Sequence, residues 1–303
     1  MAELFTPSKR DSDKRQSAPS RLINCYREPS SDRTGHVLKS SLGTEAFAET
    51  SGVLMRAMEE VGGIIYCVAG GELYSVSASG GVSTLGVVTD HPETTISGNN
   101  GKITVVAGGS YYVWDGTTLS NPAPGAFSDF GSVEFLGQRT ILTERDGRRV
   151  QWSGVVDAET LGGLDYATTE STDDNNVRAL VIVGNLWIFK ERSTEIWALT
   201  GGSGVFSPIT GATIETGLLE FGLITKIPNA AALIGDDGIV YATNGAQLQP
   251  ISTTAVETDI KNHDATRMFY HEDDGHKNIV VRFSDRPAWV CDIATGEWHE
   301  RAE

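Results

Sequence analysis

The sequence predicts an all-β protein of the propeller type, with about six blades of short antiparallel strands. Its clearest sign is a hairpin of two apolar strands, 186–190 and 195–199, in which Trp, Ile and Phe alternate with polar residues around a tight polar turn. The same hairpin pattern recurs along the chain, with an aromatic residue near the middle of each hairpin's second strand. These aromatic residues lie 38 to 48 residues apart, at Tyr74, Tyr112, Trp152, Trp197, Tyr241 and Trp289. A drifting period of roughly 40 to 50 residues with several strands per period is typical of propeller blades.

The chain begins with a polar, charged stretch, residues 1–18, that has no hydrophobic periodicity. We expect a flexible arm that orders against a partner, although a frayed terminus would explain the composition equally well. From residue 19 to 303 we predict a single propeller-like domain. Alternating residues in RLINCYRE predict a strand, and residues 37–47 predict a second extended piece. Such N-terminal strands can complete the last blade, because an unpaired sheet edge is a liability.

The blades follow in order. The first spans about 52–88 and the second about 94–122, where Asp115-Gly116 is a strong hairpin signal. The third spans about 127–167, and its polar tail through residue 176 predicts a long loop with one helical turn near 157–161. The fourth holds the hairpin at 186–199, and the fifth begins near 221. A short helix over 253–262 with Thr254 as N-cap precedes the sixth blade, which ends the sequence.

Charge is distributed unevenly along the 303 residues. The formal net charge is −16, yet residues 1–34 carry a small positive excess, so the remaining body is strongly acidic. An acidic body disfavours nucleic-acid binding, because phosphate contacts need clustered Lys and Arg. No apolar run of about 18 residues predicts a membrane span. The three cysteines are too scattered for a disulfide framework, and we expect free thiols, with Cys67 and Cys291 packed in strands.

Residues that could carry chemistry are sparse. The run HEDDGHKN, residues 271–278, has metal-binding residue types, but it separates two strands and contains Asp-Gly, so a solvated hairpin turn is the better interpretation. No nucleophile, phosphate-loop or zinc-protease motif occurs. The six Trp residues could form a sugar-stacking surface, but packing between blades explains them better. We therefore predict no enzyme activity, no cofactor and no metal.

Several stretches resemble, in order, the packaged-DNA stabilisation proteins of short-tailed phages, also called tail accessory or tail hub proteins. They are RLINCYRE, GVLMRAMEEVGGIIYCVAGGELYSV, VGNLWIFKERSTEIWALTGG and ATIETGLLEFG. The resemblance implies a propeller-like subunit of a homo-oligomeric, hexameric ring below the portal and adaptor rings. It also implies that the ring contacts other tail proteins, lies transiently near packaged DNA and helps to retain it. It implies a location in the virion, after assembly in the host cytoplasm. Family members usually continue into a second β domain, and this sequence ends at Glu303.

Two other functions stay open at this stage: a glycan-binding or adhesion propeller, and a propeller hydrolase. For the ring subunit we predict interface residues in the basic arm, the first strand and the long loop after the third blade. They are Lys9, Arg10, Lys14, Arg15, Arg21, Asn24, Tyr26, Asp157, Glu159, Asp173 and Asp174.

Overall fold

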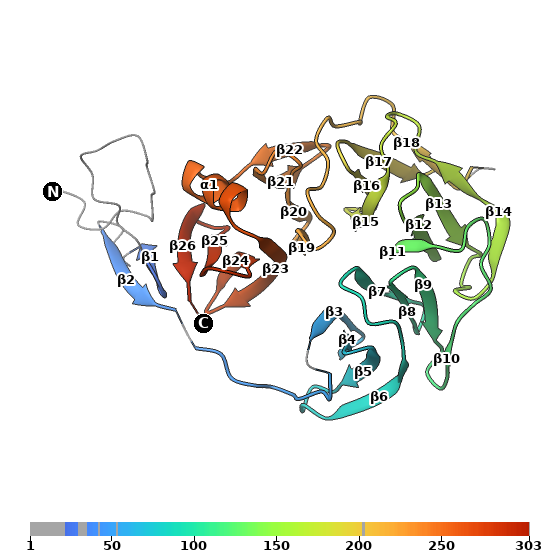
Figure 1. The fold of residues 1–303 in the computed structure, drawn as a ribbon, viewed down its shortest axis with the longest axis horizontal. Coiled ribbons are helices and arrows are strands. Elements are labelled where there is room, and N and C mark those ends of the chain that lie inside the picture. The colour runs from blue at the N-terminus through green and yellow to red at the C-terminus, as the bar shows by residue number, and fades with distance from the viewer. Residues whose placement is uncertain (1–21, 30–34, 42, 53, 202–203, 303) are drawn as a thin grey trace. The chain divides into compact units, whose positions relative to one another are not determined.

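Short antiparallel strands make up nearly all of the regular structure (Figure 1). The computed structural model describes the whole chain except residues 1–21, 30–34, 42, 53, 202–203 and 303. Over the described residues it contains six four-stranded sheets, one two-stranded sheet and one helix. The four-stranded sheets are the blades of an all-β propeller fold, which confirms the predicted fold class.

Each of the first three blades is a meander in which neighbouring strands pair in sequence order. Blade 1 contains β3 (Met55–Val61), β4 (Ile64–Ala69), β5 (Glu72–Val76) and β6 (Val82–Val87). Blade 2 contains β7 (Thr94–Asn99), β8 (Lys102–Ala107), β9 (Ser110–Trp114) and β10 (Leu119–Ser120). Blade 3 contains β11 (Phe130–Leu136), β12 (Arg139–Glu144), β13 (Arg149–Ser153) and β14 (Leu161–Thr168).

The remaining blades repeat this plan, and two further elements flank the last of them. Blade 4 contains β15 (Asn176–Ile182), β16 (Asn185–Lys190), β17 (Thr194–Leu199) and β18 (Phe206–Pro208). Blade 5 contains β19 (Ile224–Ile227), β20 (Ala230–Ile234), β21 (Val240–Asn244) and β22 (Gln247–Pro250). Blade 6 contains β23 (Ala265–Asp273), β24 (His276–Phe283), β25 (Ala288–Asp292) and β26 (Glu297–Arg301). Helix α1 (Thr254–Asn262) precedes blade 6, and β1 (Cys25–Pro29) pairs with β2 (His36–Ser40) as the N-terminal hairpin.

The repeated aromatic residues occupy the third strand of every blade, so the sequence repeat and the structural repeat coincide. Four of the six, Tyr74, Trp152, Trp197 and Trp289, are at most 4% exposed. Trp152 of blade 3 meets Phe206 of blade 4 edge to face, with ring centroids 5.4 Å apart. Trp197 belongs to the same cluster. Packing between blades 3 and 4, rather than ligand binding, therefore accounts for Trp152 and Trp197, as predicted.

The described chain separates into two compact units, one formed by residues 45–221 and the other by residues 1–44 with 222–303. In the unit with blades 1 to 4, the first strands β3, β7, β11 and β15 lie beside one another in that order (Figure 1). Hydroxyl groups join them across blades, since Val133 N donates to Thr95 Oγ1 at 2.9 Å and Ala179 N donates to Ser132 Oγ at 3.0 Å. The predicted single domain over 19–303 stays a prediction.

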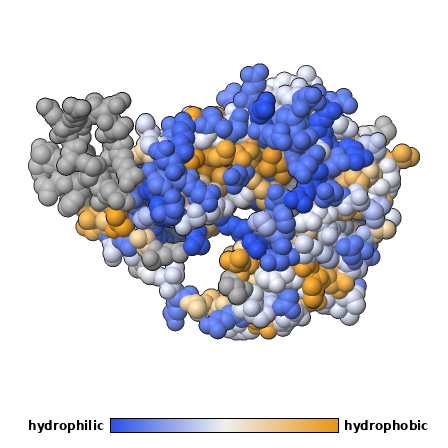
Figure 2. Space-filling model, viewed as in Figure 1, coloured by the Kyte–Doolittle hydropathy of each residue, from blue (hydrophilic) through white to orange (hydrophobic). Residues whose placement is uncertain are grey.

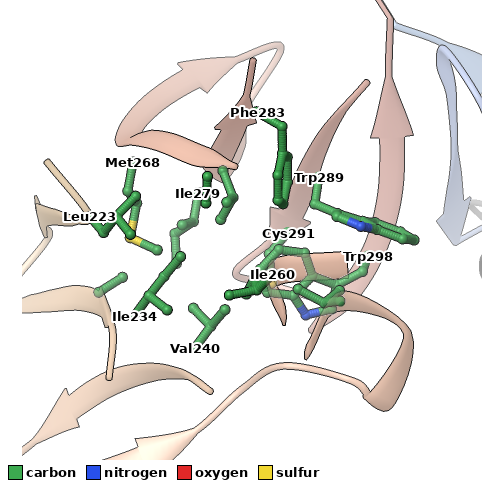
Figure 3. Packing of buried hydrophobic residues seen from close by; sticks show 14 of the residues in the cluster. Leu223, Ile234, Val240, Ile260, Met268, Ile279, Phe283, Trp289, Cys291 and Trp298 are labelled. Carbon is green, nitrogen blue, oxygen red and sulfur yellow. The ribbon is translucent and has the colours of Figure 1, made fainter. Parts of the chain in front are cut away.

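The other unit has its core between blade 5, helix α1 and blade 6 (Figure 3). Ile260 of α1 packs with Val240 of blade 5 and with Trp289 of blade 6 in this core. Asp259, on the same helix, accepts a hydrogen bond of 2.9 Å from Trp289 Nε1 and forms an ion pair with Arg286. The helix is therefore fixed to blade 6 by both apolar and polar contacts.

Three local predictions need correction. Residues 161–168 form strand β14, not a loop, and residues 157–161 form no helical turn. Because β14 is the outermost strand of its blade and pairs only with β13, it buries little surface and tolerates a polar, Gly-rich sequence. The N-cap of α1 is Thr253, not Thr254, and its side chain makes no capping hydrogen bond.

We expect Trp197→Ala to lower the free energy of unfolding by about 3–5 kcal/mol, because it leaves a large cavity between blades 3 and 4. Thermal or urea unfolding would measure the loss. Leu164→Ala is the control, since Leu164 is 91% exposed and should change stability little. Equal effects of the two substitutions would contradict the assignment of Trp197 to the inter-blade core.

Candidate interaction surfaces

A cluster of buried charged side chains fixes the loop between β14 and β15 against the tight turn between β16 and β17. Lys190, at the end of β16, is fully buried. Its Nζ donates to Thr172 Oγ1 at 2.7 Å and to the Thr172 carbonyl at 2.9 Å. It also lies 3.1 Å from Asp174 Oδ1 and 3.4 Å from Glu195 Oε1. The lysine thus contacts two buried carboxylates with its single positive charge and ties the loop before β15 to the hairpin.

Hydrogen bonds satisfy the carboxylates of this cluster. Glu195 Oε2 accepts from Trp197 Nε1 at 3.0 Å, and its Oε1 accepts from Ser171 N at 3.2 Å. Burial opposes ionisation of Asp174, but hydrogen bonds from the Thr172 hydroxyl and Arg192 N and the neighbouring Lys190 ammonium outweigh it, and the pKa of Asp174 falls to about 2. Asp174 is therefore ionised at neutral pH, and its contacts give the cluster a structural role.

We expect Lys190→Met to cost about 3–5 kcal/mol of stability, because it leaves Asp174 and Glu195 as buried carboxylates without their cation. Chemical denaturation at pH 7 would measure the cost. Arg192→Ala is the matched control, since this side chain is exposed on the same turn. A Lys190→Met protein as stable as the control variant would show that the cluster contributes nothing to folding.

An open groove of about 620 Å³ lies beside the cluster, between blades 3 and 4. It is lined by Ala167, Thr168, Glu170, Ser171, Glu195, Trp197 and Pro208. Because Glu195 is already bound by Lys190 and Trp197, the groove offers the Glu170 carboxylate and two hydroxyl groups. This set suits hydrogen bonding with a partner and contains no base placed beside a nucleophile.

The second surface, the seat, is the edge of β26 on blade 6 that the N-terminal segment, residues 22–24, covers. Residues 22–24 run parallel to β26, bridging Ile23 to Glu300. Asn24 N donates to the Glu300 carbonyl, and Glu300 N donates to the Leu22 carbonyl, both at 2.9 Å. Asn24 adopts a φ of 56°, and its Oδ1 accepts from Ala302 N at 2.8 Å. The N-terminal segment therefore adds to the outer edge of the last blade.

Histidine side chains of blade 6 lie beneath the N-terminal hairpin. The Tyr26 ring meets His276 edge to face at 5.0 Å and lies 5.9 Å from the His299 ring. His276 Nδ1 is 2.9 Å from Asp292 Oδ2. His299 is only 4% exposed, and its Nε2 finds no hydrogen-bond partner among the described residues. Burial, with help from the Arg301 guanidinium, lowers the pKa of His299 to about 4.

Acidification should weaken this seat. His299 is neutral in the folded protein but titrates near 6.5 when unfolded, so its contribution is complete above about pH 6.5 and is lost as the pH falls toward 4. We expect the melting temperature to fall over this range and His299→Gln to reduce the fall. An unchanged pH profile in that variant would mean that His299 does not govern the acid sensitivity.

The predicted interface residues fall in separate places. Lys9, Arg10, Lys14, Arg15 and Arg21 lie outside the described residues, as does the predicted arm. Asn24 and Tyr26 belong to the seat on blade 6. Asp157 and Glu159 lie between β13 and β14, where Asp157 Oδ1 accepts from Glu159 N at 2.8 Å and Glu159 pairs with Lys102 at 3.2 Å. No finding tests their role as interface residues.

The two acidic residues of the loop before β15 have different environments. The Asp173 side chain is 95% exposed and pairs with Arg148 at 2.7 Å. Asp174, only 9% exposed, turns inward to Lys190. Sequence reasoning missed Lys190 and His299, and it considered His276 only as part of the run 271–278. A lysine in the strongest hairpin was one available signal, but its burial depends on a loop that is remote in sequence.

Other candidate chemistry finds little support in the described part of the chain. The run 271–278 forms the β23–β24 hairpin, with Asp274 and Gly275 at positive φ in its turn, as predicted. No group of three potential metal ligands gathers among the described residues. Five of the six Trp residues are at most 4% exposed, and Trp114 is partly buried, so they form no sugar-stacking platform. All three cysteines are free, with Cys67 and Cys291 buried in strands as expected.

The described surface is mixed in character. On the face drawn in Figure 2, hydrophilic residues predominate and apolar residues form separate patches. No helix in the described residues has the length and apolar character needed to cross a bilayer.

Solved structures with similar folds come from unrelated settings. The chain is similar to the WD40 domain of Neurospora crassa Pan2, with 10% identity, a TM-score of 0.56 and coverage of 94% of this chain and 85% of that one. It is also similar to BBS1N, solved in complex with ARL6DN, with 10% identity, a TM-score of 0.55 and coverage of 80% and 79%.

A third similar structure is the extracellular domain of a hybrid two-component system from B. thetaiotaomicron, with 9% identity and a TM-score of 0.53. The match covers 84% of this chain but only 35% of that larger chain. At these identities the likeness shows the propeller fold alone.

Sequence comparison is more specific. No curated protein sequence matches the chain. A family model does match, with the description "Bacteriophage P22 Gp10, beta-propeller", over residues 7–301. This match covers the N-terminal segment, all six blades and helix α1. The chain therefore belongs to this family of phage structural propellers.

Proposed function

We propose that the protein is a structural subunit of a phage head-to-tail connector, forming a homo-oligomeric ring below the portal and adaptor rings. In this role it helps to retain packaged DNA and to build the tail, and it performs no catalysis. The observation that carries the proposal is the family match over residues 7–301. The fold adds a rigid scaffold whose loops and edges are available for protein contacts.

The charge of the chain supports a role beside DNA rather than tight binding to it. The net charge is −16, and many basic side chains are already paired with carboxylates. Examples are Arg56 with Asp90, Arg145 with Glu93 and Arg148 with Asp173. Paired guanidinium groups on an acidic body offer few sites for phosphate, so DNA could pass without being held by specific contacts.

The N-terminal arm is the proposed exception to this acidic character. Lys9, Arg10, Lys14 and Arg15 give it a local basic stretch. Its downstream end is fixed, because residues 22–24 bridge β26. We infer that the arm reaches from this anchor to an acidic surface of a neighbouring subunit or tail protein.

Native mass spectrometry tests the proposal. The purified protein should form a closed oligomer, alone or on addition of portal and adaptor rings, and electron microscopy should show a ring. Replacement of Lys9, Arg10, Lys14 and Arg15 by Ala should weaken assembly, most strongly at low salt, where the charges of the arm are least screened. A protein that stays monomeric with both rings present would contradict the proposed function, whereas normal assembly of the quadruple variant would remove only the arm from it.

A further inference from the structure

The N-terminal hairpin would not be stable by itself. It consists of β1 and β2 alone, and an isolated two-stranded hairpin is marginal in water. The described side chains of β2 are exposed, including Val37 at 51% and Leu38 at 39%. The hairpin therefore depends on the seat that blade 6 provides along β26.

The seat also depends on the hairpin. Glu300 is fully buried and His299 is 4% exposed, while Leu22 and Arg27 of the N-terminal segment are 9% and 7% exposed in the docked state. Removing the segment would expose the apolar Leu22 contact and leave the main chain of Glu300 without the two hydrogen bonds it makes to the segment. A blade 6 with an empty seat is thus less stable than one with a filled seat.

Charge makes the two surfaces complementary. The hairpin contributes cations, and blade 6 contributes carboxylates. Arg27 lies 3.4 Å from Glu297, and Lys39 lies 3.9 Å from Asp274. The Arg27–Glu297 contact favours this hairpin in this seat, whereas Lys39 pairs more closely with Glu28 of the hairpin itself. Neither contact to blade 6 depends on both elements belonging to one chain.

The connection from the hairpin to blade 1 is a short hinge. Ser41 still bonds to the hairpin, because its N donates to the Asn24 carbonyl at 2.9 Å. From Phe47 onward the chain lies on blade 1, since a Cβ at Gly80 would be 2.8 Å from the Phe47 carbonyl and Ala48 packs against the core there. The described hinge residues, 43–46, are exposed and belong to no strand or helix. Short hinges between two docked elements favour exchange of the element between copies.

We propose that in the assembled protein the N-terminal hairpin, β1 and β2 with the adjoining residues 22–24, fills the seat on blade 6 of a neighbouring copy. The inference rests on the proposed ring, and it identifies the contact that links the subunits. Each copy donates one hairpin and accepts one, a heterologous contact that generates a closed ring when its rotation closes. The contacts are those described above, now made between copies, so exchange adds no unfavourable term within the seat.

Crosslinking of the full chain tests the exchange. Ile23→Cys and Ala302→Cys place thiols on the hairpin segment and on the end of β26, where residues 23 and 24 meet residues 300 and 302. Cys25→Ser removes the native thiol nearby, and Cys67 and Cys291 are buried. After assembly, a short bismaleimide is added and the products are separated under denaturing conditions. Exchange predicts a ladder of covalent multimers, and mixing the two singly substituted proteins should give a linked pair.

The alternative outcomes are distinct. If the doubly substituted protein forms rings but crosslinks only within single chains, the exchange is wrong and the proposed function survives. If no crosslink forms in either preparation, the seat contact itself is wrong, and the exchange fails with it. If native mass spectrometry shows no oligomer, the proposed function fails first. Each single-cysteine protein alone is the control and should give no ladder.

Discussion

The need to bury both faces of every blade is the constraint on which the rest of the structure depends. In blade 4 all residues of the central strand from Leu186 to Lys190 are buried, so both faces of this sheet are covered. Stacking sheet against sheet meets this need, and the third-strand residues Trp152 and Trp197 belong to one apolar cluster between blades 3 and 4. Trp152 against Phe206 shows the arrangement between blades 3 and 4. Large buried rings at this position explain why the repeat is visible in the sequence at all.

Polar groups inside such stacks must be satisfied, and they decide where the connections lie. Lys190 with Asp174 and Glu195 fixes the loop between blades 3 and 4, and Arg286 with Asp259 and Glu300 joins α1 to the outer strand of blade 6. Buried ion pairs contribute little net stability compared with apolar residues, but each is costly to break. Their main effect is therefore specificity: they select one position for a loop or helix that apolar packing alone would hold loosely.

The surfaces available for assembly follow from the same architecture. The central strands are buried by packing within and between blades. The outer strands, the turns and the N-terminal segment are therefore the parts left for contacts with other chains. Residues 22–24 occupy the edge of β26, and this contact joins the N-terminal segment to the last blade. An element that is small, separately folded against its seat and joined by a short exposed hinge is well placed to link subunits.

The sequence by itself determined the propeller class, about six blades, the periodic aromatic positions and the family, because these depend on periodicity and on short local stretches such as VGNLWIFKERSTEIW. It misjudged β14, whose polar residues are permitted only because the strand lies at an edge, and edge position is a tertiary property. It also could not assign the partners of Lys190 or the burial of His299, since those contacts join segments far apart in sequence. Tertiary structure decided them, because burial and charge pairing depend on which segments meet rather than on local pattern.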